Sequence, residues 1–380
     1  MEALKKRLAR LGLMVFVTWL CMELVTCVAG RKLRERGLFY EEQDASGLAG
    51  YLAARDPALG WPRSIDWGDG QYDALHSRLV PASPDVTVKP CLSIYGDSFA
   101  WSDEADAEHA WGNVLAQRAH CRVNNFGVGG YGTDQAYLRY VQHKDDKAPV
   151  VLLTHLSENV LRNVNRFRNL LSPVTRYGLK PRFIVDASGE LALVPLFTPT
   201  SEADFLDMVR SPGRRLPHEY FAPGGPSGVS ALSFPYTLSL ARTLGSYKVR
   251  ASFAGVPPHA AFYEPGHPAD GLRVSAGIAR AFQREALSRG AAPYVIFIPL
   301  PSDFDHRKKT GRWPYTTLVD ELARTGVPHL DAGERLLAGL AGKSPCTLYS
   351  RCSGGHFTDD GYRIFGELVN DYLREQGKLP

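Results

Sequence analysis

The stretch that decides the fold is CLSIYGDSFA, residues 91–100. Its apolar run Leu92–Ile94 is typical of a buried strand, and Gly96 and Asp97 end that run directly before Ser98. A serine at this point is either the cap of the next helix or a nucleophile. A nucleophilic serine needs a base that takes its proton and donors that hold an oxyanion, so the rest of the chain must supply both.

Beyond residue 89 the sequence alternates short β-rich runs with amphipathic segments. This alternation predicts a parallel sheet with helices on both faces, a three-layer α/β/α sandwich. The predicted strands are Cys91–Tyr95, Cys121–Phe126, Val150–His155, Tyr294–Pro299 and Val327–Leu330. The predicted helices are Ala107–His120, Asp134–Gln142, Ser275–Arg289, Tyr315–Thr325 and Asp359–Glu375.

The N-terminus carries a second strong signal. Residues Leu11–Gly30 form a twenty-residue apolar span with one charge, Glu23, and basic residues stand on both sides of it. About 20 apolar residues cross a bilayer, whereas the core of a signal peptide has roughly 7–15. We therefore expect an uncleaved transmembrane anchor. A signal sequence cut near Gly30 and a lipoprotein attached at Cys27 are the alternatives, and the flanking charges do not decide the orientation.

Three consecutive segments are expected along the chain. Residues 1–30 would form a cytoplasmic tail and the anchor, residues 31–88 an irregular lead-in with one short helix near Ser46–Arg55, and residues 89–380 the main domain. The main domain holds an insertion at about 165–271, in which FIVDASGELALVPL has the pattern of a β-hairpin with Ser-Gly at the turn. Long insertions in compact domains usually serve function, so we expect this one to cover the active face and shape substrate choice.

Charge and cysteine content narrow the class of protein. The formal net charge is +4 over 380 residues, which argues against nucleic acid as a partner. Outside the apolar span there are four cysteines, Cys91, Cys121, Cys346 and Cys352. An even number, with the last two only six residues apart, suits disulfides in an oxidising compartment, and four buried thiols are an equal alternative. The disulfide interpretation predicts a periplasmic or extracellular main domain.

Four polar segments follow the predicted strands, and their residues complement one another chemically. They are Gly96–Ser98, residues 124–134, residues 155–163 and, near the C-terminus, residues 352–362. In open parallel sheets, ligands bind outside the carboxyl ends of the strands, so these segments should meet at one edge. A histidine is the usual base for a serine because its pKa lies near 7.

His356 is therefore expected to take the proton of Ser98. The backbone N–H groups of Ser98 and Gly130 and the side-chain amide of Asn159 would hold the oxyanion that forms when the serine attacks an ester. Taken alone, Ser98 is better explained as a helix cap, and the other three segments together favour a nucleophile. Asp97 is expected to hold the turn through hydrogen bonds to the backbone.

The order of these motifs resembles the SGNH/GDSL hydrolase superfamily. The matching motifs are Gly-Asp-Ser-Phe at 96–99, Asn-x-Gly-x-Gly-Gly at 125–130, an Asn after the third strand and a Gly-His near the end. The resemblance covers residues 91–375 apart from the insertion. It implies a flavodoxin-like parallel sheet, with Ser98 as nucleophile, Ser98, Gly130 and Asn159 as the oxyanion hole, His356 as base, and no cofactor or metal.

The resemblance also implies an activity. The single-pass anchor and the stretches GVGGYGTDQ and LRNVNRF are similar to a bacterial branch of these hydrolases, and related members act on acyl groups of cell-surface polysaccharides. The expected reaction is serine-dependent ester hydrolysis or O-acyl transfer through an acyl-enzyme, with an acylated carbohydrate or another ester as substrate. A catalytically inactive protein that binds or assembles such glycans is the alternative.

Two departures from the family pattern affect the site. The family usually has an aspartate three residues before the histidine, and this sequence has Ser353 there. The imidazole would then be oriented by a backbone carbonyl, by Ser353 or by an acid from elsewhere, for which Asp303 and Asp305 are candidates. The usual Asn-Asp after the third strand is Asn159-Val160, which removes a supporting carboxylate but keeps the amide.

Other functional interpretations fit less well. Residues 127–132, GVGGYG, match the dinucleotide-binding G-x-G-x-x-G, but Val151–Thr154 offer no acid at the expected distance. The G-x-S-x-G of α/β-hydrolases fails at its last position, Ala100. No zinc-binding motif is present in the sequence. Arg162, Arg166 and Arg168 are expected on a solvated face, with contact to an anionic polymer as the alternative.

Overall fold

The computed structural model describes residues 1–40, 47–61, 70–172 and 178–379. The chain divides into two compact units, each built from discontinuous segments. The first, here called the anchor unit, contains Met1–Leu48, Phe167–Tyr177 and Pro199–Pro258. The second, here called the sheet unit, contains Ala49–Arg166, Gly178–Thr198 and His259–Pro380. The N-terminal apolar helix thus shares a unit with most of the expected insertion, and the two units do not follow the three consecutive segments expected from the sequence.

The sheet unit is built on a parallel five-stranded sheet in the order β2-β1-β3-β6-β7. The strands are β1 (Leu92–Tyr95), β2 (Val123–Asn125), β3 (Val150–Leu156), β6 (Ala292–Ile298) and β7 (His329–Asp331). Counted within the sheet, this order is 2-1-3-4-5, the flavodoxin-like order. All five strands lie where the apolar runs predicted them, and the expected fold class is confirmed.

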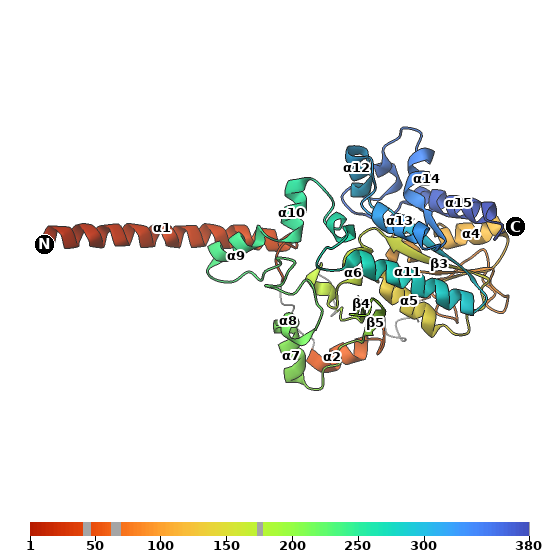
Figure 1. The fold of residues 1–380 in the computed structure, drawn as a ribbon, viewed down its shortest axis with the longest axis horizontal. Helices are drawn as coiled ribbons and strands as arrows, with labels where there is room; N and C mark the ends of the chain where they lie inside the picture. Colours follow the sequence, from red (N-terminus) through yellow and green to blue (C-terminus); the bar gives the residue numbers. More distant parts are fainter. Residues whose placement is uncertain (41–46, 62–69, 173–177, 380) are drawn as a thin grey trace. The chain divides into compact units, whose positions relative to one another are not determined.

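Helices cover both faces of this sheet (Figure 1). On one face pack α4 (Trp111–Ala119), α14 (Ala332–Gly339) and α15 (Asp359–Glu375), and on the other pack α5 (Thr133–Gln142), α11 (Gly271–Ser288) and α13 (Thr316–Arg324). The strands β3 and β6 are buried almost throughout, as expected for strands covered on both faces. Aromatic pairs fill both layers: Trp111 meets Phe365 on one face and Tyr140 meets Phe282 on the other.

The remaining elements of the sheet unit are short. They are α3 (Ser98–Trp101), α6 (Asn159–Asn163), α12 (Pro301–Thr310), the 3₁₀ turns η3 (Ala260–Tyr263) and η4 (Pro345–Leu348), and the hairpin β4 (Arg182–Val185) and β5 (Leu191–Val194). The hairpin is antiparallel and confirms the Ser-Gly turn pattern. The sequence did not predict α12 or α14. The reason in α12 is its composition, since PSDFDHRKKT has no apolar periodicity.

The anchor unit is helical. Its longest helix is α1 (Glu2–Glu35), which by length and composition could cross a bilayer. The others are α7 (Glu202–Arg210), α8 (Pro212–Arg215), α9 (Tyr236–Thr243), α10 (Tyr247–Ala254) and the 3₁₀ turn η2 (Arg168–Leu170), and α2 (Gly47–Ala54) begins in this unit and ends in the other. Apart from α1, this unit has its own small core, in which Phe221 packs against Tyr247.

The sheet unit contains two disulfides, one of the two alternatives that the four cysteines left open. Cys91 pairs with Cys121 and Cys346 with Cys352, with Cα–Cα distances of 5.9 and 5.0 Å. These distances fall in the ordinary range for a disulfide. The alternative of four buried thiols is wrong for this structure, and an oxidising compartment remains a prediction.

Candidate active site

The turn after β1 is fixed by Asp97. This residue is the N-cap of α3, and its Oδ1 accepts a hydrogen bond of 2.9 Å from the N–H of Phe99. Ser98 is therefore the first residue of the helix and not its cap, which removes the structural role that competed with nucleophilicity. Ser98 is 6% exposed, and neither its hydroxyl nor its N–H has a hydrogen-bond partner in the described part of the chain.

The second oxygen of Asp97 ties this turn to the end of β3. Its Oδ2 accepts hydrogen bonds from Nδ2 of Asn159 at 3.0 Å and from Nη1 of Arg162 at 3.2 Å. Burial raises the pKa of Asp97, and the charge of Arg162 and the hydrogen bonds to the carboxylate oppose that shift. The expected solvated face is wrong for Arg162 and Arg166, which are 5% and 3% exposed. Arg162 instead neutralises a buried carboxylate beside Ser98.

Gly130 lies in a turn from Val128 to Tyr131 that follows β2. Its φ of +78° is in the left-handed region, where a residue with a side chain would be strained. Among residues 1–40, 47–61, 70–172 and 178–379, no group accepts a hydrogen bond from the N–H of Gly130. Asn159 is fully buried, and its Nδ2 uses one of two hydrogens on Asp97. The three expected oxyanion donors thus each have a hydrogen left to give.

Trp61 flanks the Gly130 turn, a position that the sequence gave no reason to expect. Its Nε1–H donates to the carbonyl of Gly129 at 3.0 Å, and its ring meets Tyr131 edge-on. Tyr131 in turn donates to the carbonyl of Trp61 at 2.5 Å. A Cβ placed on Gly130 would lie 3.7 Å from the indole, so the tryptophan provides an apolar wall next to the free N–H.

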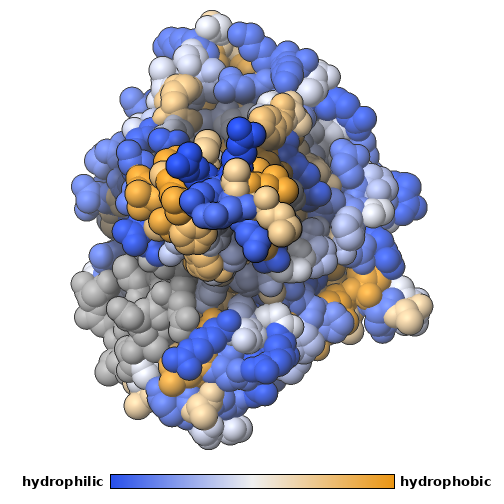
Figure 2. Space-filling view, turned by 90° about the vertical axis from the view of Figure 1, so that its left-hand side faces the viewer, coloured by the Kyte–Doolittle hydropathy of each residue, from blue (hydrophilic) through white to orange (hydrophobic). Residues whose placement is uncertain are grey.

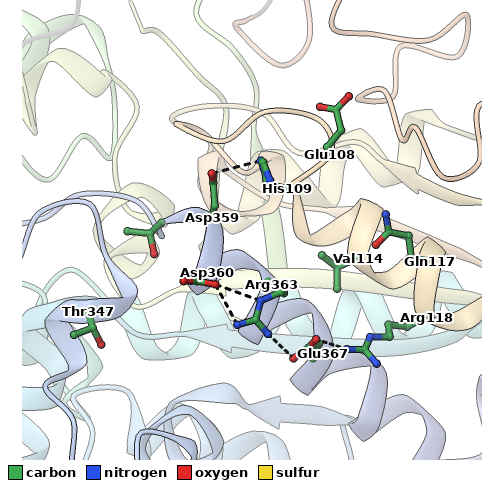
Figure 3. A pocket seen from close by; sticks show the side chains of 11 residues that line it. Glu108, His109, Val114, Gln117, Arg118, Thr347, Asp359, Asp360, Arg363 and Glu367 are labelled. Carbon is green, nitrogen blue, oxygen red and sulfur yellow. Dashed lines mark hydrogen bonds and ion pairs between the residues drawn. The ribbon is translucent and has the colours of Figure 1, made fainter.

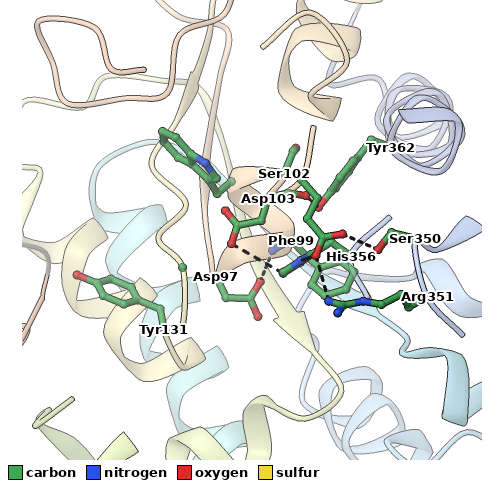
Figure 4. Close-up of polar contacts among 12 residues, drawn as sticks. Asp97, Phe99, Ser102, Asp103, Tyr131, Ser350, Arg351, His356 and Tyr362 are labelled. Atoms are coloured by element: carbon green, nitrogen blue, oxygen red, sulfur yellow. Dashed lines mark hydrogen bonds and ion pairs between the residues drawn. The ribbon is translucent and has the colours of Figure 1, made fainter. Parts of the chain in front are cut away.

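His356 lies against the segment that begins with Ser98 (Figure 4). Its Nδ1 is 3.1 Å from Oε1 of Glu104, and its Nε2 is 3.9 Å from Oδ2 of Asp103. Its ring packs on Phe99, the neighbour of the serine, with the ring centroids 5.0 Å apart. The structure therefore brings the expected base to the expected nucleophile's helix and supplies an acid for the base.

The loop that carries this acid is bound to α3. The N–H groups of Ser102 and Asp103 both donate to the carbonyl of Ser98, the second at 2.9 Å. Ser102 and Glu104 have φ angles of +71° and +69°, a conformation that costs non-glycine residues energy. Strain of this kind persists only where surrounding contacts impose it, and it is often found at functional sites.

Arg78 supplies several of these contacts. Its guanidinium donates to the carbonyls of Trp101, Ser102 and Ala105, and it also stacks on the ring of Trp101. Arg78 is 5% exposed, so the carbonyls that it binds are shielded from water. Arg78 of the lead-in segment therefore fixes the backbone of the loop whose Glu104 contacts His356.

A second loop holds the carboxylate of Glu104 from the opposite side. Ser350 donates to one of its oxygens and Arg351 lies 3.4 Å from the other, and both residues lie within the ring closed by the disulfide Cys346–Cys352. The hydrogen bonds from Ser350 and then from His356 lower the pKa of Glu104. The pKa of Asp103, by contrast, is raised by burial, and the charge of His356 opposes the shift. The contacts of Glu104 thus favour its ionised form beside the imidazole.

Asp303, an expected candidate for the orienting acid, does not contact His356. It is fully buried at the start of α12, where its Oδ1 lies 2.8 Å from Nε2 of His259 and its Oδ2 accepts from the N–H of Leu300. This part of the expectation is wrong, because both carboxylate oxygens are already used inside the core. Asp305, the other candidate, lies exposed on the same helix. The acid that the structure supplies, Glu104, was missed because it belongs to no motif.

An open polar pocket lies between α4 and α15 (Figure 3). Its charged side chains pair with one another: His109 lies 3.4 Å from Asp359, and Arg363 bridges Asp360 and Glu367. It contains none of the residues expected at the catalytic site. No group of three or more His, Cys, Asp or Glu side chains in the described residues is placed to hold a metal ion.

No protein-family model matches the sequence, and no curated protein matches it. Among solved structures, the chain is similar to TesA, with 13% identity over 75% of this chain and 98% of that chain and a TM-score of 0.38. It is also similar to a member of the lipolytic protein G-D-S-L family from Veillonella parvula, with 9% identity over 74% and 97% of the two chains and a TM-score of 0.35. A catalytic mutant of Axe2, an acetylxylan esterase from Geobacillus stearothermophilus, matches with 13% identity over 76% and 95% and a TM-score of 0.35. At this level of likeness we base the function on the residues of this chain.

Proposed function

We propose that this protein is an SGNH-type serine esterase or O-acyltransferase that a transmembrane helix holds at the membrane. The observation that carries the proposal is the contact between His356 and Glu104 on the segment that begins with Ser98. Nucleophilic catalysis needs a base that an ionised acid holds in place beside a serine whose hydroxyl is not used as a helix cap. The free N–H groups of Ser98 and Gly130 support it, because an acyl oxyanion needs such donors.

The reaction would proceed in two steps. In the first, the Ser98 oxygen attacks the ester carbonyl carbon while His356 takes the hydroxyl proton, and the oxyanion is held by Ser98, Gly130 and Asn159. Collapse breaks the bond to the leaving alcohol, which receives the proton from His356 and leaves an acyl-serine. In the second, His356 deprotonates water or the hydroxyl of a glycan, which attacks the acyl-serine and releases either the acid or a new ester.

Glu104 would replace the aspartate that the family carries before its histidine. Hydrogen bonding from Nδ1–H to a carboxylate fixes the tautomer and leaves Nε2 free to accept the serine proton. The acid comes from the nucleophile's own loop and not from the histidine's. This supports an active enzyme over an inactive glycan-binding protein, since the missing motif acid was the reason to consider the latter.

The cellular setting belongs to the same proposal. An uncleaved α1 would anchor the protein, and the two disulfides suit a sheet unit on the periplasmic or extracellular side of the membrane. Acylated carbohydrate of the cell surface would then be the substrate within reach.

The test uses the full chain in detergent. A fluorophosphonate probe should label the wild type, and p-nitrophenyl acetate should be hydrolysed, because both need only an activated serine and an oxyanion hole. Ser98→Ala should abolish labelling and lower the rate of ester hydrolysis about 10³-fold or more. Products formed with an added acylated oligosaccharide, with and without an acceptor sugar, would distinguish hydrolysis from transfer.

The same experiment can contradict the proposal. If well-folded wild-type protein is neither labelled nor active, the inactive glycan-binding alternative is favoured. If Ser98→Ala is labelled as well as the wild type, another nucleophile is at work and the assignment of Ser98 fails.

A further inference from the structure

The anchor unit places a second segment alongside α1. The loop before α9 packs closely on the C-terminal part of the helix, where a Cβ on Gly30 would lie 2.6 Å from Leu232. Two residues later Phe234 meets Trp19 edge-on, with ring centroids 5.7 Å apart. From Gly30 to Trp19 is about 16 Å along a helix, at roughly 1.5 Å per residue. The segment therefore runs along α1 toward the middle of the apolar span before it turns.

Glu23 fixes the return of this segment. It is the one charged residue of the span Leu11–Gly30, and it is 4% exposed although most of the span is exposed. Its Oε2 accepts a 2.5 Å hydrogen bond from the N–H of Tyr236, and its Oε1 accepts from the hydroxyl of Thr237. These groups form the first turn of α9, where unpaired N–H groups and the helix dipole favour a negative charge. The start of α9 is thus at the depth of Glu23.

We propose that Leu232–Leu244 is a re-entrant membrane hairpin, here called the α9 hairpin, and that lipid acyl chains are its partner. This proposal rests on the anchor part of the proposed function. If α1 crosses the bilayer, residues that pack on Trp19 and Glu23 must lie within the apolar layer too. A carboxylate at that depth is costly unless it is paired, and the α9 hairpin supplies its partners.

The composition of the α9 hairpin suits this location. The 22 residues from Tyr220 to Ala241 contain no Asp, Glu, Lys, Arg or His, and the one charged residue of the α9 hairpin, Arg242, is exposed in the last turn of α9. Within the α9 hairpin Phe234, Leu238 and Leu244 are 60%, 45% and 61% exposed, which is unusual for large apolar side chains facing water. Figure 2 faces the N-terminal end of α1, and hydrophobic surface gathers at the centre of that view. Continuity with the exposed apolar surface of α1 identifies lipid as the partner.

Several polar groups of the α9 hairpin are satisfied internally, as the apolar layer requires. Ser239 accepts from the N–H of Ser233 and donates to its carbonyl at 2.7 Å. Thr243 donates to the carbonyl of Ser239 and pairs with Ser230. Irregular backbone is tolerated at membrane depth only when its hydrogen bonds are made within the protein.

Depth-dependent quenching in lipid vesicles tests the proposal. The background is the full chain with Cys21→Ser and Cys27→Ser, since these are the free cysteines and the others are in disulfides. Single cysteines replace Phe234, Leu20 or Leu287 and carry the fluorophore NBD, in phosphatidylcholine–phosphatidylglycerol vesicles. Quenching by nitroxide on the acyl chains reports lipid contact, and quenching by iodide reports water contact.

For probes at positions 20 and 234, we expect the acyl-chain nitroxide to quench the fluorescence and iodide not to quench it. The probe at position 287, on an exposed leucine of the sheet unit, should behave in the opposite way. If position 20 is lipid-quenched but position 234 is quenched by iodide or by neither agent, water or a second copy covers the α9 hairpin and the proposal is overturned. If position 20 is not lipid-quenched, the anchor itself is wrong, and the α9 hairpin proposal is overturned with it.

Variants of Glu23 test what holds the α9 hairpin in place. Glu23→Leu removes the acceptors of Tyr236 and Thr237 and should lose the lipid quenching at position 234. Glu23→Gln keeps an oxygen acceptor and should retain most of that quenching. Equal quenching in the leucine variant and the parent would overturn the role assigned to Glu23.

Discussion

Two of the histidine–carboxylate pairs in the sheet unit differ in accessibility. His259 and Asp303 are 2.8 Å apart and nearly inaccessible, with side chains 3% and 0% exposed. His356 and Glu104 are 3.1 Å apart, with side chains 24% and 38% exposed. By distance and burial the first pair is the stronger contact. Only the second pair lies against the segment that begins with Ser98.

The difference is the one expected if the first pair is structural and the second belongs to the proposed catalytic site. A base must reach both a nucleophile and a substrate, so one of its nitrogens must remain uncommitted and accessible. His259 commits Nε2 to Asp303 inside the core. His356 commits Nδ1 to Glu104 and faces Asp103 with Nε2 at 3.9 Å, too far for a hydrogen bond. Partial exposure is therefore a requirement of the function, and it limits the strength of the pair.

The largest expected effect in this comparison comes from Glu104→Gln. The substitution keeps the shape but removes the charge that favours the imidazolium, so kcat/KM for p-nitrophenyl acetate should fall about 10- to 100-fold. This loss is smaller than for a fully buried triad acid because water screens part of the charge.

Two further variants sharpen this prediction. Glu108→Gln changes an exposed glutamate four residues along the chain and should leave the rate unchanged. Asp103→Asn tests the other carboxylate near His356. If Asp103→Asn lowers the rate much more than Glu104→Gln, Asp103 and not Glu104 is the acid that serves the histidine.

Asp303→Asn should have the opposite signature. The side chain loses the charge that binds His259, so the free energy of unfolding should fall by roughly 1–3 kcal/mol. The kcat/KM of the folded fraction should stay within about twofold of the wild type, since Asp303 does not contact His356. Urea denaturation followed by circular dichroism measures the first quantity, and ester hydrolysis by the native protein measures the second.

Asp305→Asn is the matched control on the same helix. Because Asp305 is exposed, the change should alter the stability by no more than about 0.5 kcal/mol. A large loss of kcat/KM in Asp303→Asn with unchanged stability would remove the distinction between the two pairs.

The sequence predicted the sheet because its signals are local. Each strand is a short apolar run that ends in a polar segment, and the parallel topology brings those ends together. This is why Ser98, Gly130 and Asn159 could be selected before the structure was known. In the structure, Asp97 holds the turn of Ser98 and binds Asn159, and Arg162 links this buried carboxylate to Tyr131 at the end of the Gly130 turn. The role of Asp97 in the turn was expected and is confirmed.

The orienting acid could not be predicted because its position depends on contacts between distant segments. Glu104 contacts His356 because Ser102 and Glu104 itself adopt the left-handed conformation. Arg78, from the irregular lead-in, binds the carbonyl of Ser102, and Ser350, from a loop about 250 residues away, binds the carboxylate of Glu104. None of these residues forms a periodic pattern or a motif. Trp61 was missed for the same reason. Asp303 was a candidate because it follows a predicted strand, but both of its carboxylate oxygens are bound, to His259 and to the N–H of Leu300.

The smallest expected effect concerns a third histidine, His155, which has no acid beside it. Its Nε2–H donates to Tyr263, whose hydroxyl donates onward to the carbonyl of Ser157, and its Nδ1 accepts from Thr133. Burial lowers the pKa of His155 to about 3, as it does for His143. The folded protein therefore keeps these rings neutral where the unfolded chain, with a pKa of about 6.5, takes up protons.

The sign of the pH effect follows directly. Their contribution is fully present above pH about 6.5 and is lost as the pH falls, by up to about 1.4 kcal/mol per pH unit for each histidine. Glutamine at position 155 cannot titrate, so the unfolding free energy of His155→Gln should fall less steeply between pH 6.5 and 4.5 than that of the wild type, as measured by urea denaturation. The part of the fall that His155 and His143 cause together should be about halved. An unchanged slope in His155→Gln would mean that this ring takes up a proton in the folded protein as readily as in the unfolded chain, and the assignment of a buried neutral ring would be wrong.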